Sequence, residues 1–366
     1  NSFKGIVQNF KKKICLIVDS LSIGGAERVA AKLSVELYKM GYDVSIICLR
    51  DEITYPFKGE LYNLGLKEFK FKIIKQLSKF FKFKYAYKIT NSDYYIDFRT
   101  RNRPVMEWCF YQFIFDLSKI IFTIHSYEVF FHIPKHKWFF KHYSKAPAVI
   151  GVSNEIINRL VSLFPFTNLK YIPNFYNSES LYKTDFNTEI QTPFLLAVGR
   201  LDNSTKQFDK LIEAYIKTNF FKDKVPLYII GEGPDKAQLE FQIKQGDLEN
   251  LVCLLGFKSE VKNYMKAAKC IVMSSNVEGF PMVLLEALSI GTPVISFDCP
   301  SGPSELIIDG ENGVLVENQN FEAFVSALDK MHSDTKFYNH CKSNAITSVE
   351  KFSAKNVISM WEDLLN

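Results

Sequence analysis

Residues 276–286 read NVEGFPMVLLE, and they indicate the class of fold because they place the start of a helix directly after a strand. Pro281 favours the first turn of a helix, and Gly291 favours its end. An apolar run at 270–274 precedes the stretch, and another follows at 294–297. Strand, helix and strand in this order predict one unit of a parallel sheet.

The same alternation occurs in both halves of the chain and restarts after a boundary near 174–192. Two doubly wound parallel-sheet domains are therefore predicted, and ligands of such sheets bind at the carboxyl ends of the strands. The predicted elements are strands at 13–18, 44–49, 194–198, 227–230 and 251–255, and helices at 26–40 and 207–217.

Bulk composition agrees with two globular domains. The chain has 366 residues, of which 47% are hydrophobic and 23% charged, which excludes disordered and fibrous classes. Its seven cysteines are an odd number without C-x-x-C spacing, as expected for buried thiols in a reducing compartment. Neither an 18-residue apolar run nor a signal-peptide pattern occurs, so we expect a cytoplasmic protein.

The helix that begins at Pro281 is a candidate anion site. The amides of Met282 and Val283 and the positive end of the helix dipole suit a diphosphate, and Glu278 lies just before them. Glu286 lies roughly 7 to 8 Å further along the helix axis, at 1.5 Å per residue, which is about the reach from a diphosphate to a ribose. The alternative is that Glu278 only caps the dipole and Glu286 is a solvated helix residue.

A second loop carries two cations toward the same sheet edge. Gly199-Arg200-Leu201 and Lys206 follow the predicted strand at 194–198. Two cations and a helix terminus can share one diphosphate, which favours the ligand-binding interpretation of Glu278.

These residues resemble the retaining glycosyltransferases of family 4. The resemblance rests on their combined spacing, and EGFPMVLLEA with GTPVISFDCPSGPSE is most similar to the amylovoran branch of exopolysaccharide and O-antigen biosynthesis. The matching motifs are GGAER at 24–28, GRL at 199–201 with Lys206, GEGP at 231–234, LGF at 255–257, and the carboxylates Glu278 and Glu286.

The resemblance implies a GT-B fold, in which two Rossmann-like α/β domains face each other across a cleft. We expect an acceptor-binding domain at 1–177, a nucleotide-sugar domain at 178–350, and a helix at 351–366 that returns to the first domain. An apolar face that includes Trp361 fits this last expectation.

The resemblance also implies roles for individual residues. Arg200 and Lys206 would hold the donor diphosphate, Glu278 would contact the transferred sugar, Glu286 the ribose, and His125 would lie near the sugar. The sequence departs from the family at two places, because no acidic residue follows His125 and Gln207 stands where glycine is usual after the lysine. The expected donor-binding residues are Gly24, Gly25, Gly199, Gly231, Phe257, Gly279, Phe280, Pro281, Met282, Val283 and Glu286.

Gly24 and Gly25 leave two interpretations open. They let a backbone approach the diphosphate closely, or they form a tight strand-to-helix turn that needs a positive φ. No D-x-D motif occurs where a divalent cation would bind, so we expect neither a metal nor a cofactor. Retention implied by the family favours front-face attack, in which the departing phosphate oxygen takes the acceptor's proton. A covalent route through Glu278 is the alternative.

The acceptor side is less distinct in sequence, but its charge is informative. Residues 1–177 carry 27 Lys and Arg against 14 Asp and Glu, a net charge of +13, while the remainder is acidic. The segment 67–88 holds eight lysines among phenylalanines, and 130–142 is also basic and aromatic. Either an ordinary solvated helix or contact with an anionic inner leaflet explains this pattern. We favour the second, with a polyprenyl-diphosphate-linked saccharide as acceptor.

Other functions remain to be weighed. The resemblance implies a transferase that takes a hexose or N-acetylhexosamine from a UDP-sugar. The alternatives are a GDP-mannose-type mannosyltransferase, a nucleotide-sugar epimerase and a non-catalytic GT-B subunit. A dinucleotide oxidoreductase would need G-x-G-x-x-G, which SIGGAERVA lacks. No nucleic-acid-binding motif accompanies the lysines, so nucleic acid is not an expected partner.

Overall fold

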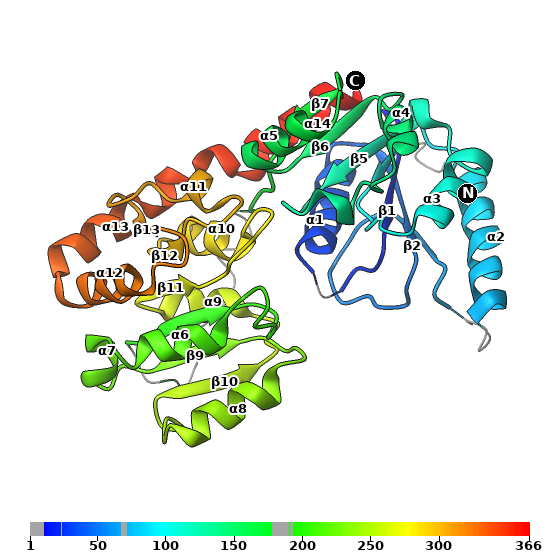
Figure 1. The fold of residues 1–366 in the computed structure, drawn as a ribbon. Helices are drawn as coiled ribbons and strands as arrows, with labels where there is room; N and C mark the ends of the chain where they lie inside the picture. The colour runs from blue at the N-terminus through cyan, green and yellow to red at the C-terminus, as the bar shows by residue number, and fades with distance from the viewer. Residues whose placement is uncertain (1–10, 23, 67–71, 178–189, 191–192) are drawn as a thin grey trace, which may run out of the picture. The chain divides into compact units, whose positions relative to one another are not determined.

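The structure is a computed structural model of the chain, and it describes residues 11–22, 24–66, 72–177, 190 and 193–366. The chain divides into two compact units (Figure 1), residues 1–173 with 358–366 and residues 174–357. The expected domain bounds at 177 and 350 differ from this division by a few residues. The segment 178–189, which begins the second expected domain, lies outside the described residues.

Unit 1 contains a seven-stranded parallel sheet in the order β3-β2-β1-β4-β5-β6-β7. Strands β5 and β6 are buried along their whole length and β1 is buried after Lys13, as expected for a sheet covered by helices on both faces. Its strands are β1 Lys13–Val18, β2 Asp43–Cys48, β3 Glu60–Asn63, β4 Tyr94–Asp97, β5 Ile120–Ile124, β6 Ala148–Gly151 and β7 Leu169–Tyr171. Its helices are α1 Gly25–Lys39, α2 Lys72–Thr90, α3 Pro104–Phe113, α4 Phe140–Tyr143 and α5 Asn154–Leu163.

Unit 2 contains a six-stranded parallel sheet in the order β10-β9-β8-β11-β12-β13. Its strands are β8 Leu195–Val198, β9 Leu227–Ile230, β10 Val252–Gly256, β11 Cys270–Met273, β12 Val294–Phe297 and β13 Gly313–Val316. Its helices are α6 Phe208–Tyr215, α7 Asn219–Lys222, α8 Lys236–Gln245, α9 Val261–Ala267, α10 Met282–Ser289, α11 Pro303–Leu306, α12 Phe321–Ser333 and α13 Thr335–Ser348.

Both sheets reverse their strand order beside the first strand of the unit. In unit 1 the reversal lies between β1 and β4, and in unit 2 it lies between β8 and β11. Such switch points open a crevice at the carboxyl ends of the two strands, where doubly wound sheets bind ligands. The α/β class and the doubly wound parallel sheets expected from the sequence are confirmed.

The last helix, α14 (Ala354–Leu365), carries the chain into unit 1. Trp361 is 4% exposed, so the apolar face seen in the sequence is buried. Lys11 Nζ forms an ion pair with Glu362 Oε1 at 2.7 Å, and Lys12 Nζ donates to the carbonyl of Leu365 at 2.6 Å. These contacts fix the C-terminal residues beside the beginning of β1.

Two further findings concern the cysteines and the apolarity of the helices. All seven cysteines are free thiols, and the two that are not buried, Cys109 and Cys253, are partly exposed. Among the described residues, no helix combines the length and the apolarity needed to cross a bilayer.

Candidate functional site

The loop after β8 in unit 2 is fastened to the loop after β11. Its turn closes through the amide of Lys206, which donates to the carbonyl of Asp202 at 2.8 Å. Ser274 Oγ donates to the carbonyl oxygen of Lys206 at 2.7 Å. The amide of Asn276 donates to the carbonyl oxygen of Thr205 at 3.0 Å. The switch point therefore holds both loops in a fixed arrangement.

Lys206 and Glu278, which are 72 positions apart in sequence, meet at this point. Lys206 Nζ forms an ion pair with Glu278 Oε1, and their side chains are 23% and 12% exposed. Glu278 is held from the other side, because its amide donates to the carbonyl of Pro300 at 2.6 Å. The sequence predicted that these two side chains share one site, and the structure brings them into direct contact.

Gln207 has a left-handed backbone, with φ at 53° and ψ at 42°. Glycine adopts this conformation without a steric cost, which gives the physical reason for glycine at this position in the family. The Gln207 side chain is 5% exposed and its amide lies 3.0 Å from that of Gln319. The departure noted in the sequence therefore leaves the loop intact, because hydrogen bonding holds the side chain in place.

Helix α10 begins immediately after Pro281, whose side chain cannot accept a hydrogen bond from the first turn. Met282 and Val283 are its first two residues, so their amides have no acceptor within the helix. Phe280 is 6% exposed and its ring packs 5.4 Å from that of Phe352, which anchors the turn that leads into the helix. A Cβ on Gly302 would lie 2.6 Å from Pro281 Cδ, so only glycine fits beside this turn.

Glu286 is 1% exposed, although it lies on the second turn of α10. The alternative that it is a solvated helix residue is therefore wrong. Carboxylates are almost never buried to this degree without partners, so Glu286 is held by its surroundings.

The remaining predicted residues of unit 2 divide into packing and exposed positions. A Cβ on Gly231 would lie 1.8 Å from the carbonyl oxygen of Gly199, so this pair lets two loops approach closely. Arg200 is exposed, and Phe257 is 62% exposed. The side chains of Arg200 and Phe257 are accessible to a ligand. Gly231 has a packing role, because it allows the close contact with Gly199.

In unit 1, Gly24 caps the start of α1. A Cβ there would lie 2.0 Å from Glu27 Oε2, whereas a Cβ on Gly25 would meet no atom within 4 Å. The Glu27 carboxylate thus folds back over the helix start, and burial together with nearby Asp19 raises its pKa. Gly24 therefore fits the interpretation as a tight strand-to-helix turn. The space beside the Gly25 backbone is open, so it fits a close approach of the diphosphate.

His125 follows β5 and is half-buried, with both ring nitrogens shielded from solvent. Neither ring nitrogen has a hydrogen-bond partner among the described residues, and the ring stacks on Phe98 at 5.2 Å. Burial, followed by electrostatic interaction with nearby His132 and Arg101, holds the pKa of His125 well below its usual range. The ring is therefore neutral.

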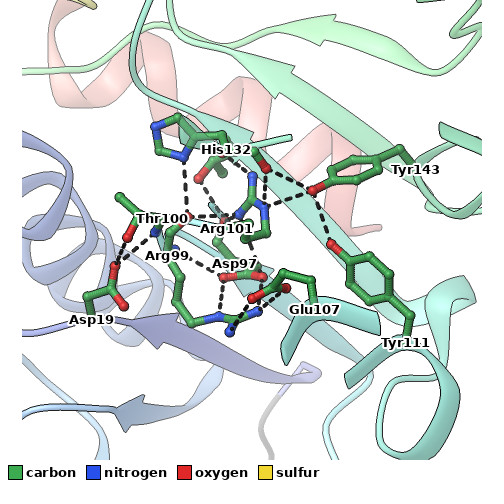
Figure 2. A network of polar contacts seen from close by, with 10 residues as sticks. Asp19, Asp97, Arg99, Thr100, Arg101, Glu107, Tyr111, His132 and Tyr143 are labelled. Atoms are coloured by element: carbon green, nitrogen blue, oxygen red, sulfur yellow. Dashed lines mark hydrogen bonds and ion pairs between the residues drawn. The ribbon is translucent and has the colours of Figure 1, made fainter. Parts of the chain in front are cut away.

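A buried ionic cluster of unit 1 was not predicted from the sequence (Figure 2). Arg99 donates to both oxygens of Asp97 at 2.9 Å and to both oxygens of Glu107 at 3.2 and 3.3 Å. All three side chains are at most 3% exposed. Burial raises the pKa of Glu107 to about 7, whereas the two arginines that follow β4 lower the pKa of Asp97 against the effect of its burial.

Arg101 binds main-chain carbonyls from three segments around the same cluster (Figure 2). It donates to the carbonyl oxygens of Asp97 at 3.0 Å, Thr123 at 2.8 Å and His132 at 2.7 Å. Tyr143 Oη donates to the carbonyl of His132 at 2.8 Å. This arginine therefore fixes the ends of β4 and β5, from which His125 extends.

One signal could have revealed the cluster. The charged run FRTRNR follows the strand YYID at 94–97 directly, so its first arginine lies at a sheet edge rather than on a solvated helix. Among the described residues, no group of three His, Cys, Asp or Glu side chains could hold a metal ion.

Comparisons with known proteins place both units. The family models "Glycosyltransferase Family 4" and "Glycosyl transferases group 1" match residues 23–180 and 181–348. The chain is 29% identical to an amylovoran biosynthesis glycosyltransferase of Erwinia amylovora, over 97% of this chain and 99% of that protein.

A further relative is the N-acetylgalactosaminyltransferase of Campylobacter jejuni that acts on N-acetylgalactosamine-N,N'-diacetylbacillosaminyl-diphospho-undecaprenol, 29% identical over 93% of this chain and 96% of that protein. Two solved structures share the fold. TarM of Staphylococcus aureus has a TM-score of 0.78 at 17% identity, covering 99% of this chain and 100% of TarM. Anabaena HepE, in complex with UDP and glucose, has a TM-score of 0.77 at 19% identity, covering 96% of this chain and 99% of HepE.

Proposed function

The chain belongs to glycosyltransferase family 4 and has the GT-B fold, and from this premise we propose that it transfers a hexose or N-acetylhexosamine from a UDP-sugar to a polyprenyl-diphosphate-linked saccharide. The reaction retains anomeric configuration, needs no metal and serves bacterial surface polysaccharide biosynthesis. The observation that carries the proposal is the contact between Lys206 and Glu278.

The donor diphosphate is the largest charge that this site has to meet. Lys206 lies in the loop beside Glu278, Arg200 is exposed in the same loop, and α10 begins four residues after Glu278. Without a metal, a leaving diphosphate needs several donors, and two cations with the amides of Met282 and Val283 supply them. The diphosphate competes with Glu278 for the Lys206 ammonium, which leaves the carboxylate to accept hydrogen bonds from the sugar.

Glu286 is proposed to bind the ribose. Its place on the second turn of α10 puts it roughly one helical pitch, about 5 Å, beyond the first amides. A buried carboxylate there accepts hydrogen bonds from both ribose hydroxyls, as acidic residues do in other nucleotide sites. HepE, which was solved with UDP and glucose, shares this fold and supports the choice of UDP.

Retention is proposed to proceed by front-face attack. The bond between the anomeric carbon and the phosphate oxygen breaks, the acceptor oxygen bonds to the same face, and the departing phosphate oxygen takes the acceptor's proton. His125 is neutral and has unpaired ring nitrogens, so it can hydrogen-bond a sugar hydroxyl without adding charge. Glu278, once the diphosphate has taken the Lys206 ammonium, is assigned to hydrogen bonds with the sugar, and the covalent route through it is the alternative.

The acceptor proposal takes support from relatives and from α2. The Campylobacter relative acts on a saccharide linked to diphospho-undecaprenol, as its name states. Helix α2 exposes a stripe of large apolar residues at helical spacing, and Lys84 and Lys88 are exposed beside it. The stripe comprises Ile74, Leu77, Phe81, Tyr85 and Ile89, which are 44 to 68% exposed.

This surface fits the inner leaflet better than the solvated-helix alternative does, since a solvated face would be polar. The segment 67–71, which holds two further lysines of the basic segment, lies outside the described residues. The second basic segment, 130–142, contributes less than expected, because Ile133 and Phe139 are buried and its exposed residues are Phe131, His136 and the lysines.

A product assay tests the proposal. The purified chain is incubated with UDP-GalNAc, UDP-GlcNAc, UDP-glucose, UDP-galactose or GDP-mannose and a synthetic N-acetylgalactosaminyl-diphospho-polyprenol, in EDTA. We expect UDP release that depends on the acceptor and a new α-linkage by NMR. GDP-mannose as the sole donor, dependence on added Mg²⁺, or free sugar epimerised without an acceptor would each contradict part of the proposal.

A further inference from the structure

Unit 1 contains a cavity of about 590 Å³ that none of the residues proposed above lines. It opens at the carboxyl ends of β1, β2 and β4 and lies between α2 and α3. Ligand pockets have volumes of about 300–1,000 Å³ and occupy this edge of doubly wound sheets. The position and the size of the cavity are therefore those of a binding site.

The base of the cavity is the buried ionic cluster. Arg99 and Glu107 line it, and the Arg99 guanidinium lies 4.7 Å from the ring centre of Phe110. A buried ion pair of this kind adds little to stability compared with apolar side chains of the same volume. Its presence at the base of a cavity, beside the aromatic rings of Phe80 and Phe83, points to a ligand that uses both charge and apolar surface.

The cluster keeps hydrogen-bonding capacity for a ligand. Each carboxylate oxygen has two acceptor sites, and each oxygen of Glu107 accepts one hydrogen bond from Arg99. Each oxygen thus retains a lone pair for a hydroxyl. The rings of Phe80 and Phe110, whose centres are 6.0 Å apart, supply an apolar face beside these oxygens.

The mouth of the cavity carries both signs of charge. Cations and carboxylates are nearly balanced there, together with amide and hydroxyl groups. A diphosphate site would need cations in excess, whereas a sugar, whose hydroxyls both donate and accept, suits a balanced set. The cations are Arg50, Lys75, Lys79 and Arg103, the carboxylates Asp19, Asp51 and Glu52, and the neutral polar groups Gln76, Thr100 and Asn102.

We propose that this cavity binds a saccharide unit of the acceptor, with Arg99 and Glu107 contacting its hydroxyls and Phe80 and Phe110 packing against its apolar face. The proposal rests on the proposed function, because it assumes that the acceptor is a saccharide. It adds where that saccharide is recognised and assigns the ionic cluster to specificity rather than to chemistry.

Binding without turnover tests this assignment. Neutral p-nitrophenyl glycosides of GalNAc, GlcNAc, glucose and galactose are titrated into the full chain by saturation-transfer NMR, with citronellyl diphosphate as a probe that lacks sugar. Met106→Trp fills the cavity from α3, and Gln76→Trp fills it from an exposed position on α2. Val105→Trp, one position away on α3 and 76% exposed, is the matched control.

We expect at least one glycoside to bind. Both cavity-filling variants should raise its Kd at least tenfold, and Val105→Trp should change its Kd less than twofold. UDP affinity should be the same in all four proteins. The proposal is overturned if the wild-type chain transfers sugar but binds no glycoside, or if the filling variants bind the glycosides as tightly as the wild type does. It is also overturned if the filling variants lose binding of citronellyl diphosphate alone. Failure of the proposed function shows itself separately, as a lack of acceptor-dependent UDP release by the wild-type chain.

Discussion

Replacement of Glu107 by glutamine should remove a pH dependence of stability from unit 1. Burial raises the pKa of Glu107 from its ordinary 4.5 to about 7, so the folded chain holds this proton at pH values at which the unfolded chain has lost it. The free energy of unfolding must then fall as pH rises from about 4.5 to about 7. At about 1.4 kcal/mol per pKa unit, the loss amounts to about 3 kcal/mol and is complete above pH 7.

The measurement is urea unfolding at pH 5 and pH 8, followed by tryptophan fluorescence. Trp108, Trp138 and Trp361 are the three tryptophans of the chain, and all belong to unit 1, so the signal reports on that unit alone. The Glu107→Gln variant keeps the shape of the side chain and cannot titrate. Subtracting its unfolding free energy from that of the wild type at each pH cancels the other titrating groups.

We expect the wild type to lose about 2 to 3 kcal/mol more than Glu107→Gln between the two pH values, because part of the whole loss already occurs below pH 5. Glu128→Gln, at an exposed position of the same unit, serves as the control and should follow the wild type. Equal pH dependence in wild type and Glu107→Gln, within about 1 kcal/mol, would refute the assignment of a buried, destabilised carboxylate.

Three further outcomes are expected. Lys206→Ala and Glu286→Ala should each lower donor turnover by roughly tenfold to a hundredfold through loss of a charged contact, measured as kcat/KM for UDP release; wild-type rates in both would contradict the donor site. Gly231→Ala should destabilise unit 2 by about 1–3 kcal/mol because its Cβ would meet a carbonyl oxygen, whereas Gly25→Ala, with open space around it, should change stability by less than about 0.5 kcal/mol, measured by thermal unfolding. Phe81→Ser, at a side chain that is 64% exposed on α2, should reduce flotation with anionic liposomes several-fold and leave turnover of a short water-soluble acceptor unchanged; unaltered flotation would remove α2 from the membrane contact.

The fold was predictable because its signals are local. Most strands are short apolar runs, and several helices carry a glycine or proline at one end, as at Pro281 and Gly291. Such features act within a few residues, so the order of elements could be derived from the sequence. The order in turn predicted that loops after β8 and β11 meet, which brought Lys206 to Glu278.

Burial of individual polar side chains was less predictable. Glu286 appears in the sequence as one more helical glutamate, and only the packing of α10 shows that it is 1% exposed. Gln207 appeared to weaken its loop, but a contact with Gln319, 112 positions away, holds it in place. Both depend on residues distant in sequence, which periodicity does not report.

The ionic cluster shows that the charge of a sequence segment does not predict whether its side chains are exposed when the segment lies at the carboxyl edge of a sheet. In the sequence, Arg99 and Arg101 belong to a basic half with a net charge of +13, and a basic stretch is ordinarily a solvated surface. In the structure both arginines are at most 2% exposed, and their partners are carboxylates and carbonyls of the same unit. Their charge is therefore already balanced within the protein and contributes little to attraction of an anionic membrane. That attraction falls to the exposed lysines of α2, so the two sides of this helix divide the acceptor between them, with the saccharide assigned to the cavity and the lipid to the exposed stripe.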